Sequence, residues 1–511
     1  MGCTGEREIS AAELAMHKEE KCSWVAFYGT VYDVSSFVAF HPGGKKVILD
    51  LAGKDGTESF QAIHPKSMLE RLPPGCRVGH LNPTEQRKAQ TGIEEPLTLM
   101  LPPAGVDCFA SIKSYFNKFM ESRACASSAS SKKSEEKKGL KFESLDDIIN
   151  IYDFEMAAQE KMAKTGYDYY ASAACDEVTK RANCDVFSRV WLRPRIMVDV
   201  SNVNTSTCLL GSHSSFPLFF SPAAMAGMAH ADGECALARA AGKFGIVQCI
   251  ANMATRDFED IVAERVPGQT QWYQICINPD RQRSEAMLQR VLAAGVTTLF
   301  VTVDCNVVGR RERDQRNKLK DKSAVAKEQR TEATTAGGVI GALGNFTDAS
   351  WNWKDLAWLR QVTHGKMKIL LKGVQTGEDA VLAAQHGLDG ILVSNHGGRQ
   401  LDHVRPTLHA LAEITATLEE AGLSDKLEVF LDGGIRRGTD IYKALALGAK
   451  AVGIGRPALF SLAYGQAGID KCVQILKDEF TNCMQLMGKT SVSQISRSDI
   501  VCEFPTTAVQ C

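Results

Sequence analysis

GILVSNHGGR, residues 390–399, is a short apolar run that ends abruptly in polar residues and glycines. EVFLDGGIRR, residues 428–437, and AVGIGR, residues 451–456, repeat this arrangement further along the chain. In each stretch, residues suited to a buried strand lead into a polar loop and then into a helix-like pattern. Strands that are apolar on both faces and alternate with helices predict a parallel sheet.

Eight such runs recur in the chain. They cover residues 218–222, 246–250, 272–277, 298–304, 368–374, 390–395, 428–432 and 451–455. Helical spacing of Ala, Leu and Val over residues 376–386 and 437–447 ends at Gly387 and Gly448, as expected of helix C-caps. Eight β/α units predict a closed (β/α)8 TIM barrel of the α/β class. An open doubly wound sheet is the alternative, but the GxGxxG pattern expected after its first strand is missing from the sequence.

A smaller module precedes the barrel. WVAFYGTVYDVSSFVAF, residues 24–40, is typical of two strands that turn at Gly29, and it runs into the HPGG stretch that begins at His41. His64 follows two short helical stretches. Two histidines on loops can bind a haem iron from opposite faces, which leaves a haem that transfers single electrons and does not bind oxygen. The alternative is that each is an ordinary loop histidine.

The segment between the two modules has no periodicity. Residues 124–138 read ACASSASSKKSEEKK and contain too little apolar surface to fold alone. We therefore expect an α+β haem-binding domain over residues 8–82, a flexible linker over residues 83–140, and the barrel over residues 141–505.

Composition excludes several classes of function. Lys plus Arg number 59 against 60 for Asp plus Glu, so no global field of one sign exists to bind nucleic acid. The longest apolar stretches are interrupted by Pro, Gly and Ser, which predicts no transmembrane helix.

Cysteine usage and the N-terminus bear on location. Sixteen Cys are scattered without CxxC pairs, which indicates reduced thiols in a reducing compartment. No presequence pattern is visible, so we expect a cytoplasmic protein, with the mitochondrial intermembrane space as the alternative. Gly2 and Cys3 leave N-terminal acylation open, although Glu6 stands where the myristoylation pattern has Ser or Thr.

The polar residues that end the strands form a candidate active site, because barrel enzymes carry their sites at the carboxyl ends of the strands. His396 can act as a base, and Asp304 can hydrogen-bond its imidazole. Arg311 and Arg399 can bind a carboxylate through paired N–H groups. This set of groups suits the oxidation of a 2-hydroxy acid.

A cofactor with a phosphate and a conjugated ring is also indicated. Glycines after the last two strands, together with Arg436 and Arg456, can bind a phosphate. Lys372 ends the fifth strand, where its ammonium can stabilise the negative charge that develops on a reduced flavin. The sequence therefore predicts FMN.

These residues also resemble known families. The HPGG stretch and His64 resemble the cytochrome b5 family over roughly residues 8–81, which implies haem b with His41 and His64 as iron ligands. Residues 142–505 resemble the FMN-dependent 2-hydroxy-acid dehydrogenase/oxidase family. The matching stretches are YYASAACDE (169–177), SPAAM (221–225), QWYQ (271–274), VTVD (301–304), GRRE (309–312), LKGV (371–374), SNHGGRQLD (394–402), DGGIRRGTD (432–440) and GRP (455–457).

The resemblance implies a role for each matching position. His396 is implied as the base paired with Asp304, and substrate binding is implied for Tyr169, Arg311, Arg399 and Cys276. FMN binding is implied for Ala223, Ala224, Gln274, Thr302, Lys372, Ser394, Asp432, Gly433, Gly434, Arg436, Gly455 and Arg456.

The order of the two modules resembles the flavocytochrome b2 family. This implies oxidation of an L-2-hydroxy acid, with L-lactate as the first candidate, and electron transfer through haem b to a cytochrome c-like acceptor. A homotetramer is implied by resemblance alone. Two alternatives stay open: an oxidase that uses oxygen and produces hydrogen peroxide, and a catalytically weakened haem/flavin redox sensor.

Three positions depart from the family pattern. Cys276 stands where the family has a Tyr that hydrogen-bonds the substrate, which predicts slower turnover or a different substrate. Ala251 replaces a Ser that contacts the flavin, and Ala173 replaces a Gly. Residues 313–345 form a long polar insertion after the fourth strand, which we interpret as a lid over the site, with a surface loop of no function as the alternative.

Overall fold

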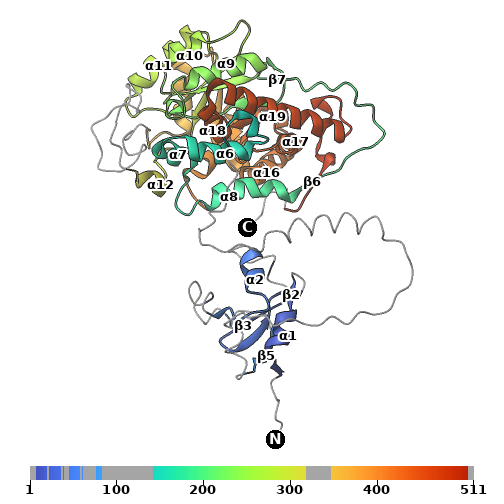
Figure 1. The fold of residues 1–511 in the computed structure, drawn as a ribbon. Helices are drawn as coiled ribbons and strands as arrows, with labels where there is room; N and C mark the ends of the chain where they lie inside the picture. Colours follow the sequence, from blue (N-terminus) through green and yellow to red (C-terminus); the bar gives the residue numbers. More distant parts are fainter. Residues whose placement is uncertain are drawn as a thin grey trace. The chain divides into compact units, whose positions relative to one another are not determined.

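A computed structural model of the chain describes residues 7–19, 22–35, 38, 45–57, 60, 69, 76–82, 142–317 and 347–504. The chain divides into two compact units, Met1–Lys133 and Ser134–Cys511, which Figure 1 draws and which are described separately below. His41, His64, the expected linker and most of the expected lid lie outside the described residues.

The smaller unit contains a five-stranded sheet in the order β1-β5-β4-β3-β2. The elements are β1 (Glu8–Ile9), α1 (Ala11–Met16), β2 (Lys18–Glu19), β3 (Cys22–Phe27), β4 (Thr30–Asp33), α2 (Lys45–Leu51) and β5 (Arg77–Leu81). The β3–β4 hairpin turns at Tyr28 and Gly29, both with positive φ, so the predicted turn at Gly29 is confirmed.

Side chains along β3 alternate between two small cores. Val25 and Phe27 pack with Ile48 of α2 on one face, while Ala26 packs with Leu14 of α1 on the other. The alternation follows the two-residue period of a strand. The smaller unit therefore has apolar residues on both sides of its sheet, and its predicted α+β class is confirmed.

The larger unit contains the predicted closed barrel of eight parallel strands. The strands are β9 (Leu218–Phe220), β10 (Val247–Ala251), β11 (Gln271–Ile275), β12 (Thr298–Thr302), β13 (Lys368–Val374), β14 (Gly390–Val393), β15 (Glu428–Asp432) and β16 (Ala451–Ile454). β13 and β15 have the predicted bounds. Most of the others end one or two residues before the predicted end, because the last polar residues of each run leave the ladder.

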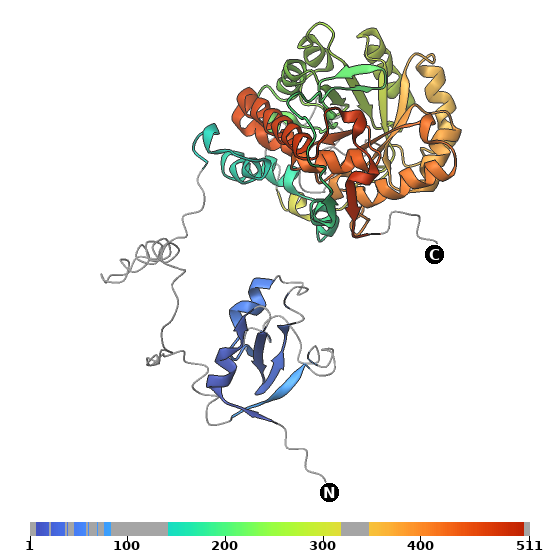
Figure 2. The same ribbon diagram turned by 90° about the vertical axis from the view of Figure 1, so that its right-hand side faces the viewer.

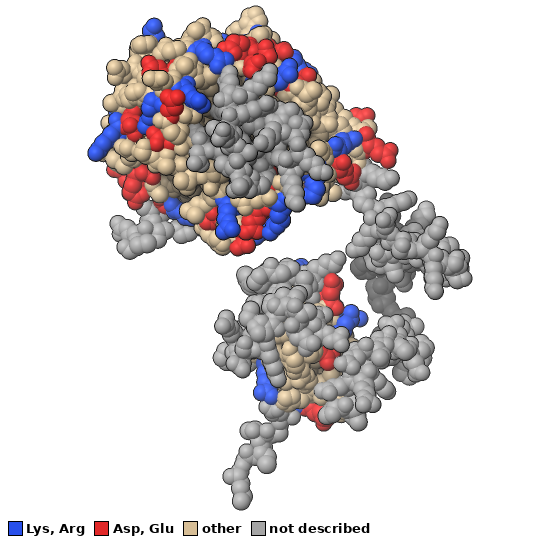
Figure 3. Space-filling view, turned by 90° about the vertical axis from the view of Figure 1, so that its left-hand side faces the viewer, with Lys and Arg blue, Asp and Glu red and all other residues tan. Residues whose placement is uncertain are grey.

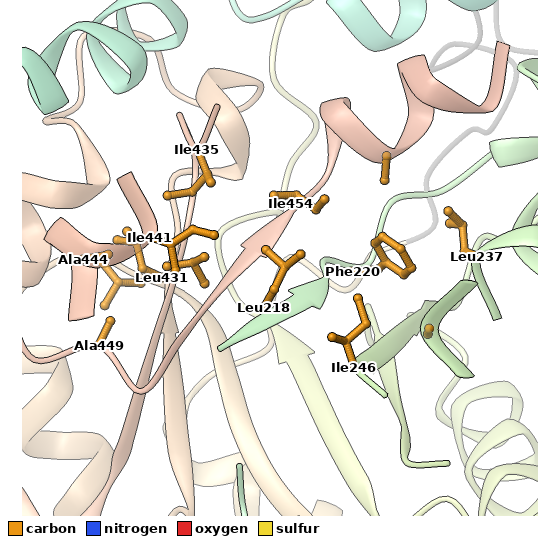
Figure 4. Packing of buried hydrophobic residues seen from close by; sticks show 14 of the residues in the cluster. Leu218, Phe220, Leu237, Ile246, Leu431, Ile435, Ile441, Ala444, Ala449 and Ile454 are labelled. Atoms are coloured by element: carbon orange, nitrogen blue, oxygen red, sulfur yellow. The ribbon is translucent and has the colours of Figure 1, made fainter. Parts of the chain in front are cut away.

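Side chains on β9 show how the barrel is filled. Leu218 and Phe220 point outward and pack with residues such as Ile454 in the layer between strands and helices (Figure 4). Phe219, between them, points inward to the aromatic ring of Trp272, whose centroid lies 5.3 Å away. The strand is therefore buried on both faces, as expected of a barrel strand.

A short hairpin, β7 (Thr207–Leu209) and β8 (Ser212–Ser214), covers the amino end of the barrel. Leu209 and Leu210 join the inner aromatic cluster. The backbone N–H of Leu210 donates to Glu428, the first residue of β15, at 2.9 Å. Since the amino end is closed, the carboxyl end is the accessible one.

Helices surround the barrel strands on the outside (Figure 2). The α-helices described in the larger unit are α6 (Ile151–Lys161), α7 (Lys164–Ala171), α8 (Val178–Asp185), α9 (Glu234–Phe244), α10 (Phe258–Ala263), α11 (Arg281–Ala293), α12 (Glu312–Gln315), α14 (Leu356–Val362), α15 (Gly377–Gln385), α16 (Thr407–Glu420), α17 (Gly438–Ala446), α18 (Arg456–Ser461) and α19 (Gly465–Leu486). A two-stranded antiparallel sheet, β6 (Val190–Leu192) with β17 (Ile500–Cys502), lies at the edge of the unit. Both predicted helices are confirmed, as α15 and α17.

Surface charge and thiols agree with the composition. On the face of the barrel unit in Figure 3, described residues of both signs are interspersed. The cysteines among the described residues are free thiols. Within the described part of the chain, no helix is long and apolar enough to cross a membrane.

Candidate active site

A pocket opens at the carboxyl ends of the barrel strands and brings together most of the residues expected there. Its lining includes Tyr169, Ala223, Ala224, Gln274, Cys276, Thr302, Arg311, Lys372, His396, Arg399, Asp432, Gly433, Gly434, Arg436, Gly455 and Arg456. These residues come together because the carboxyl ends of parallel barrel strands all lie at the same end of the barrel.

His396 and Asp304 form a hydrogen-bonded pair. The Nδ1 atom of His396 lies 3.0 Å from Oδ1 of Asp304. His396 has a left-handed backbone with φ of 57°, and its N–H donates to Oγ of Ser394 at 3.1 Å. Because Nδ1 is held by the carboxylate, Nε2 is the nitrogen left to exchange a proton with a substrate.

Electrostatics keep this imidazole neutral. Burial and the ammonium of Lys372 lower the pKa of His396 to about 4, although the carboxylate of Asp304 opposes the shift. The pKa of Asp304 is itself lowered, since its interactions with His396 and Lys372 outweigh the effect of burial. We expect a neutral imidazole beside an ionised carboxylate, and that pair is ready to accept a proton.

Lys372 lies buried between two carboxylates. Burial alone would lower the pKa of Lys372, but Asp304 and Asp432 outweigh burial and the pKa is raised. The side chain on β13 therefore stays an ammonium. It supplies a fixed positive charge at the floor of the pocket.

Two buried carboxylate oxygens lack a hydrogen-bond partner among the described residues, Oδ2 of Asp304 and Oδ1 of Asp432. The other oxygen of Asp432 accepts from Oγ of Ser221 at 3.1 Å. Buried polar atoms without a partner are rare in native proteins and point to a bound group. The unpartnered oxygen of Asp432, which lines the pocket, and the ammonium of Lys372 fit a polar ring such as flavin.

The rim beyond β15 and β16 fits a phosphate. Gly433 and Gly434 have φ of 100° and 86°, and a Cβ added to Gly434 would lie 1.9 Å from the carbonyl oxygen of Asn183. A Cβ added to Gly455 would meet open space. Arg436 and Arg456 line the same part of the pocket. A phosphate is bound by backbone N–H groups that it can approach closely and by guanidinium groups, and this rim offers both.

Arg399 and Arg456 also donate hydrogen bonds to backbone carbonyls in the last turn of α7 and just after it. NH1 of Arg399 donates to the carbonyl oxygens of Tyr169 at 2.6 Å and Ser172 at 3.1 Å. Arg456 donates to the Ser172 carbonyl at 2.8 Å and to the Gly397 carbonyl at 2.9 Å. Among the described residues, Nε and NH2 of Arg399 have no hydrogen-bond partner, so these atoms can bind a carboxylate.

Arg311 lies beside Arg399 in the lining of the pocket. Its Nε donates to the Arg399 carbonyl at 3.1 Å and its NH2 to the Gln400 side chain at 3.0 Å. The guanidinium of Arg399 also lies over the ring of Tyr169, 4.8 Å from the centroid. Three groups expected to bind a carboxylate are thus on one side of the pocket.

Ser394, a residue expected to bind FMN, lies behind the residues that line the pocket. It is fully buried, does not line the pocket, and its Oγ accepts from the His396 backbone and also bonds the Asp432 carboxylate. It therefore holds two residues that line the pocket. Asp304 likewise acts from behind His396.

Several lining residues were not expected individually: Tyr170, Ser221, Ile435 and Pro457 lie in the matching stretches, whereas Cys305 and Leu459 lie outside them. Ser221 follows the first strand, so the rule used for the other strand ends could have found it. Cys305 and Leu459 carried no polar signal that separates them from core residues.

The three departures from the family pattern have distinct surroundings. Cys276 lines the pocket and its Sγ accepts from Nε2 of Gln274 at 3.3 Å; burial, with Cys305 nearby, raises its pKa to about 12. Ala251 also lines the pocket. Ala173 has no positive φ, so its Cβ brings no backbone strain. Cys276 is therefore a neutral thiol and the departure nearest to the chemistry.

Comparison with family models decides the assignment. Residues 158–502 match the FMN-dependent dehydrogenase model. The chain belongs to this family. Residues 10–82 match the cytochrome b5-like heme/steroid binding domain, and FMN and haem b are therefore its cofactors.

Two relatives match almost the whole chain, and a third matches 70% of it. The L-lactate dehydrogenase (cytochrome) of Wickerhamomyces anomalus is 38% identical over 492 residues, 96% of this chain and 79% of the relative. Its counterpart from Saccharomyces cerevisiae is 38% identical over 510 residues, with the same coverage of both chains. The spinach (Spinacia oleracea) glycolate oxidase is 42% identical over 367 residues, 70% of this chain and 97% of the relative.

Solved structures agree with the fold. A flavocytochrome b2 variant superposes with a TM-score of 0.64 and 39% identity, covering 70% of this chain and 88% of the other. Mandelate oxidase with (S)-4-hydroxymandelic acid gives a TM-score of 0.64 and 33% identity, covering 70% and 99%. The chain is thus an FMN-dependent dehydrogenase with an N-terminal cytochrome b5-like domain.

Proposed function

We propose that the chain oxidises an L-2-hydroxy acid, with L-lactate as the first candidate, to the 2-oxo acid and passes the electrons through haem b to a cytochrome c-like acceptor. The observation that carries the proposal is the 3.0 Å hydrogen bond between His396 and Asp304 beside buried Lys372. The names of the two yeast relatives support the substrate and the acceptor.

Each group in the pocket has a distinct task in this proposal. Arg311, Arg399 and Tyr169 bind the substrate carboxylate and fix the hydroxyl-bearing carbon beside His396. Nε2 of His396 takes a proton from that substrate, and Asp304 stabilises the imidazolium that results. FMN, when bound, accepts the electron pair that leaves the substrate, and haem b transfers electrons one at a time. Lys372 holds a positive charge where negative charge develops.

The iron ligands are proposed from sequence. His41 and His64 would hold the haem iron with one imidazole each, and the haem would then supply single-electron transfer. A haem ligated in this way suits delivery of single electrons to a soluble haem protein.

Steady-state turnover tests the proposal directly. L-lactate, glycolate, L-mandelate and longer L-2-hydroxy acids would each be supplied with cytochrome c or oxygen as the acceptor. We expect reduction of cytochrome c with at least one of them and little hydrogen peroxide. Failure of every 2-hydroxy acid with both cofactors bound would contradict the proposal and favour a redox sensor.

An oxidase is the second candidate. The glycolate oxidase similarity supports it, since that relative is covered over 97% of its length by the barrel region alone. Peroxide formed at the rate of substrate consumption, with cytochrome c reduced only slowly, would favour the oxidase.

Assembly and location remain expectations from the sequence. We propose a homotetramer in the cytoplasm, supported by the free thiols of the described residues. The intermembrane space of mitochondria and acylation at Gly2 or Cys3 are the alternatives. Cell fractionation and the mass of the N-terminal peptide distinguish them.

A further inference from the structure

The loops that follow β12 and β14 contact each other at the carboxyl end of the barrel. The first, residues 303–311, carries Asp304 and Arg311. The second carries His396 and Arg399. β13 lies between β12 and β14 in the barrel, so these two strands share no ladder of backbone hydrogen bonds. The relative position of the two loops therefore depends on the contacts that the loops themselves make.

Gly309 lets the two loops pack backbone against backbone. A Cβ added to Gly309 would lie 2.4 Å from the carbonyl oxygens of Arg399 and Gln400, so a larger residue cannot stand here without moving a loop. Nε of Arg311 donates to the Arg399 carbonyl at 3.1 Å. The loop with the base and the loop with its carboxylate are thus in direct contact.

The side-chain amide of Gln400 makes four hydrogen bonds across this contact. Its Nε2 donates to the carbonyl oxygens of Asp304 at 3.1 Å and Val307 at 2.9 Å. Its Oε1 accepts from the N–H of Gly309 at 3.3 Å and from NH2 of Arg311 at 3.0 Å. An amide has two donor hydrogens and two acceptor lone pairs, so its whole capacity is used on the loop after β12.

The four partners require an amide in one orientation. The two carbonyl oxygens can only accept a hydrogen bond, and the backbone N–H and the guanidinium can only donate one. A carboxylate at this position would face the two carbonyl oxygens without a hydrogen to offer them. An apolar side chain would leave all four groups without this partner. Gln400 meets both needs at once.

Gln400 itself does not line the pocket, but two of its partners belong to the site. Arg311 is buried and lines the pocket, and Asp304 holds His396. Since Nε and NH2 of Arg311 are held by the loop after β14, NH1 is the nitrogen without a hydrogen-bond partner among the described residues. The amide therefore fixes a guanidinium with one nitrogen left for a carboxylate.

We propose that Gln400 is a positioning residue for the reaction, which sets Arg311 for the substrate carboxylate and holds the Asp304 segment against His396. The inference rests on the proposed function, because Arg311 and His396 act there on a 2-hydroxy acid. An unmodified protein that oxidises no 2-hydroxy acid would refute that function. The tests below compare variants with an active unmodified protein, so the two failures are distinguishable.

Steady-state kinetics of Gln400→Met test the role directly, since methionine keeps the length and removes the amide. We expect KM for the best L-2-hydroxy acid to rise about tenfold and kcat per bound FMN to fall about tenfold, because both loops lose their alignment. Gln289→Met is the matched control: the Gln289 amide donates to the Val362 carbonyl at 2.9 Å, between α11 and α14. Its kcat and KM should stay within about twofold. Equally small changes in Gln400→Met would overturn the proposal.

A double-mutant cycle tests whether the amide acts through Arg311. The probe is the 2-oxo acid product, whose dissociation constant from the oxidised holoprotein is measured by the change in flavin absorbance, without turnover. Gln400→Met and Arg311→Lys should each weaken binding. The double variant should bind no more weakly than Arg311→Lys, because the amide then has no guanidinium to position. Losses that simply add would overturn this route.

A pH profile tests the closeness of Gln400 to the base. Burial, Lys372 and Arg311 each lower the pKa of His396. Gln400→Glu would add a negative charge beside Arg311, so it should raise that pKa and move the acid limb of kcat/KM to higher pH. Gln400→Met adds no charge and should leave the limb in place although turnover is slower. A limb that does not move in Gln400→Glu, or that moves as far in Gln400→Met, would overturn the proposal.

Discussion

The imidazole of His396 and the carboxylate of Asp304 meet at 3.0 Å although 92 residues separate them in the chain. Asp304 comes just after β12, and His396 comes just after β14. β13, which carries Lys372, lies between those two strands in the barrel. The base, its carboxylate and the ammonium therefore come from three successive strands.

Replacement of Asp304 by Asn should reduce turnover strongly. An amide cannot stabilise an imidazolium and favours the wrong tautomer of His396, so we expect kcat to fall by roughly 100-fold or more. Steady-state assays would measure this, with flavin absorbance showing that FMN is retained. Asp425→Asn, at an exposed carboxylate, is the control. A variant of Asp304 with nearly native kcat would show that the pair has no part in the reaction.

The pH dependence should reflect a base that is already neutral. Burial and Lys372 lower the pKa of His396 to about 4, below the ordinary histidine value. The active form is the unprotonated one, so kcat/KM should fall only as the pH drops well below about 6.5 and stay level above it. An acid limb centred at or above pH 6.5 would contradict a lowered pKa.

Substitutions at Cys276 should separate packing from chemistry. Cys276→Ala should change kcat for L-lactate by no more than about threefold, since a neutral thiol is a weak donor. Cys276→Tyr introduces a phenol donor and should raise kcat about tenfold if the ring is accommodated. Steady-state kcat and KM, with flavin content measured, would check both. A loss of 100-fold in the alanine variant would mean that the thiol takes part in the reaction.

Removal of either expected iron ligand should abolish the reduction of cytochrome c but leave substrate oxidation at the flavin. His41→Ala and His64→Ala should lose the haem absorbance and the reduction of cytochrome c, while a small-molecule acceptor that reacts at the flavin is still reduced. His17→Ala, in the same unit, is the control. Continued reduction of cytochrome c without haem would contradict the proposed electron path.

The barrel was predictable because its signal is local and periodic. β13 and β15 are apolar runs between polar boundaries, and their predicted bounds are confirmed. The strand-end rule likewise identified Lys372, His396 and Asp432 as members of one pocket. Such inferences need only the strand period and the parallel order of the sheet.

Other features depend on tertiary contacts that no local pattern carries. Ser394 lies near the end of a predicted strand yet is buried beside Asp432 behind the pocket lining. NH1 of Arg399 donates to the carbonyl oxygens of Tyr169, in α7, and of Ser172, just after it. Met197 could be read as an ordinary core residue in the sequence. Its exposure depends on how residues 193–204 contact the end of α19.

Rapid mixing of the oxidised holoprotein with L-lactate, or with the best L-2-hydroxy acid found, tests the central claim most directly. The account predicts that the flavin absorbance bleaches first and that haem reduction follows at a rate at least equal to steady-state turnover with cytochrome c. A flavin that is reduced while the haem stays oxidised, or follows more slowly than turnover, would contradict it.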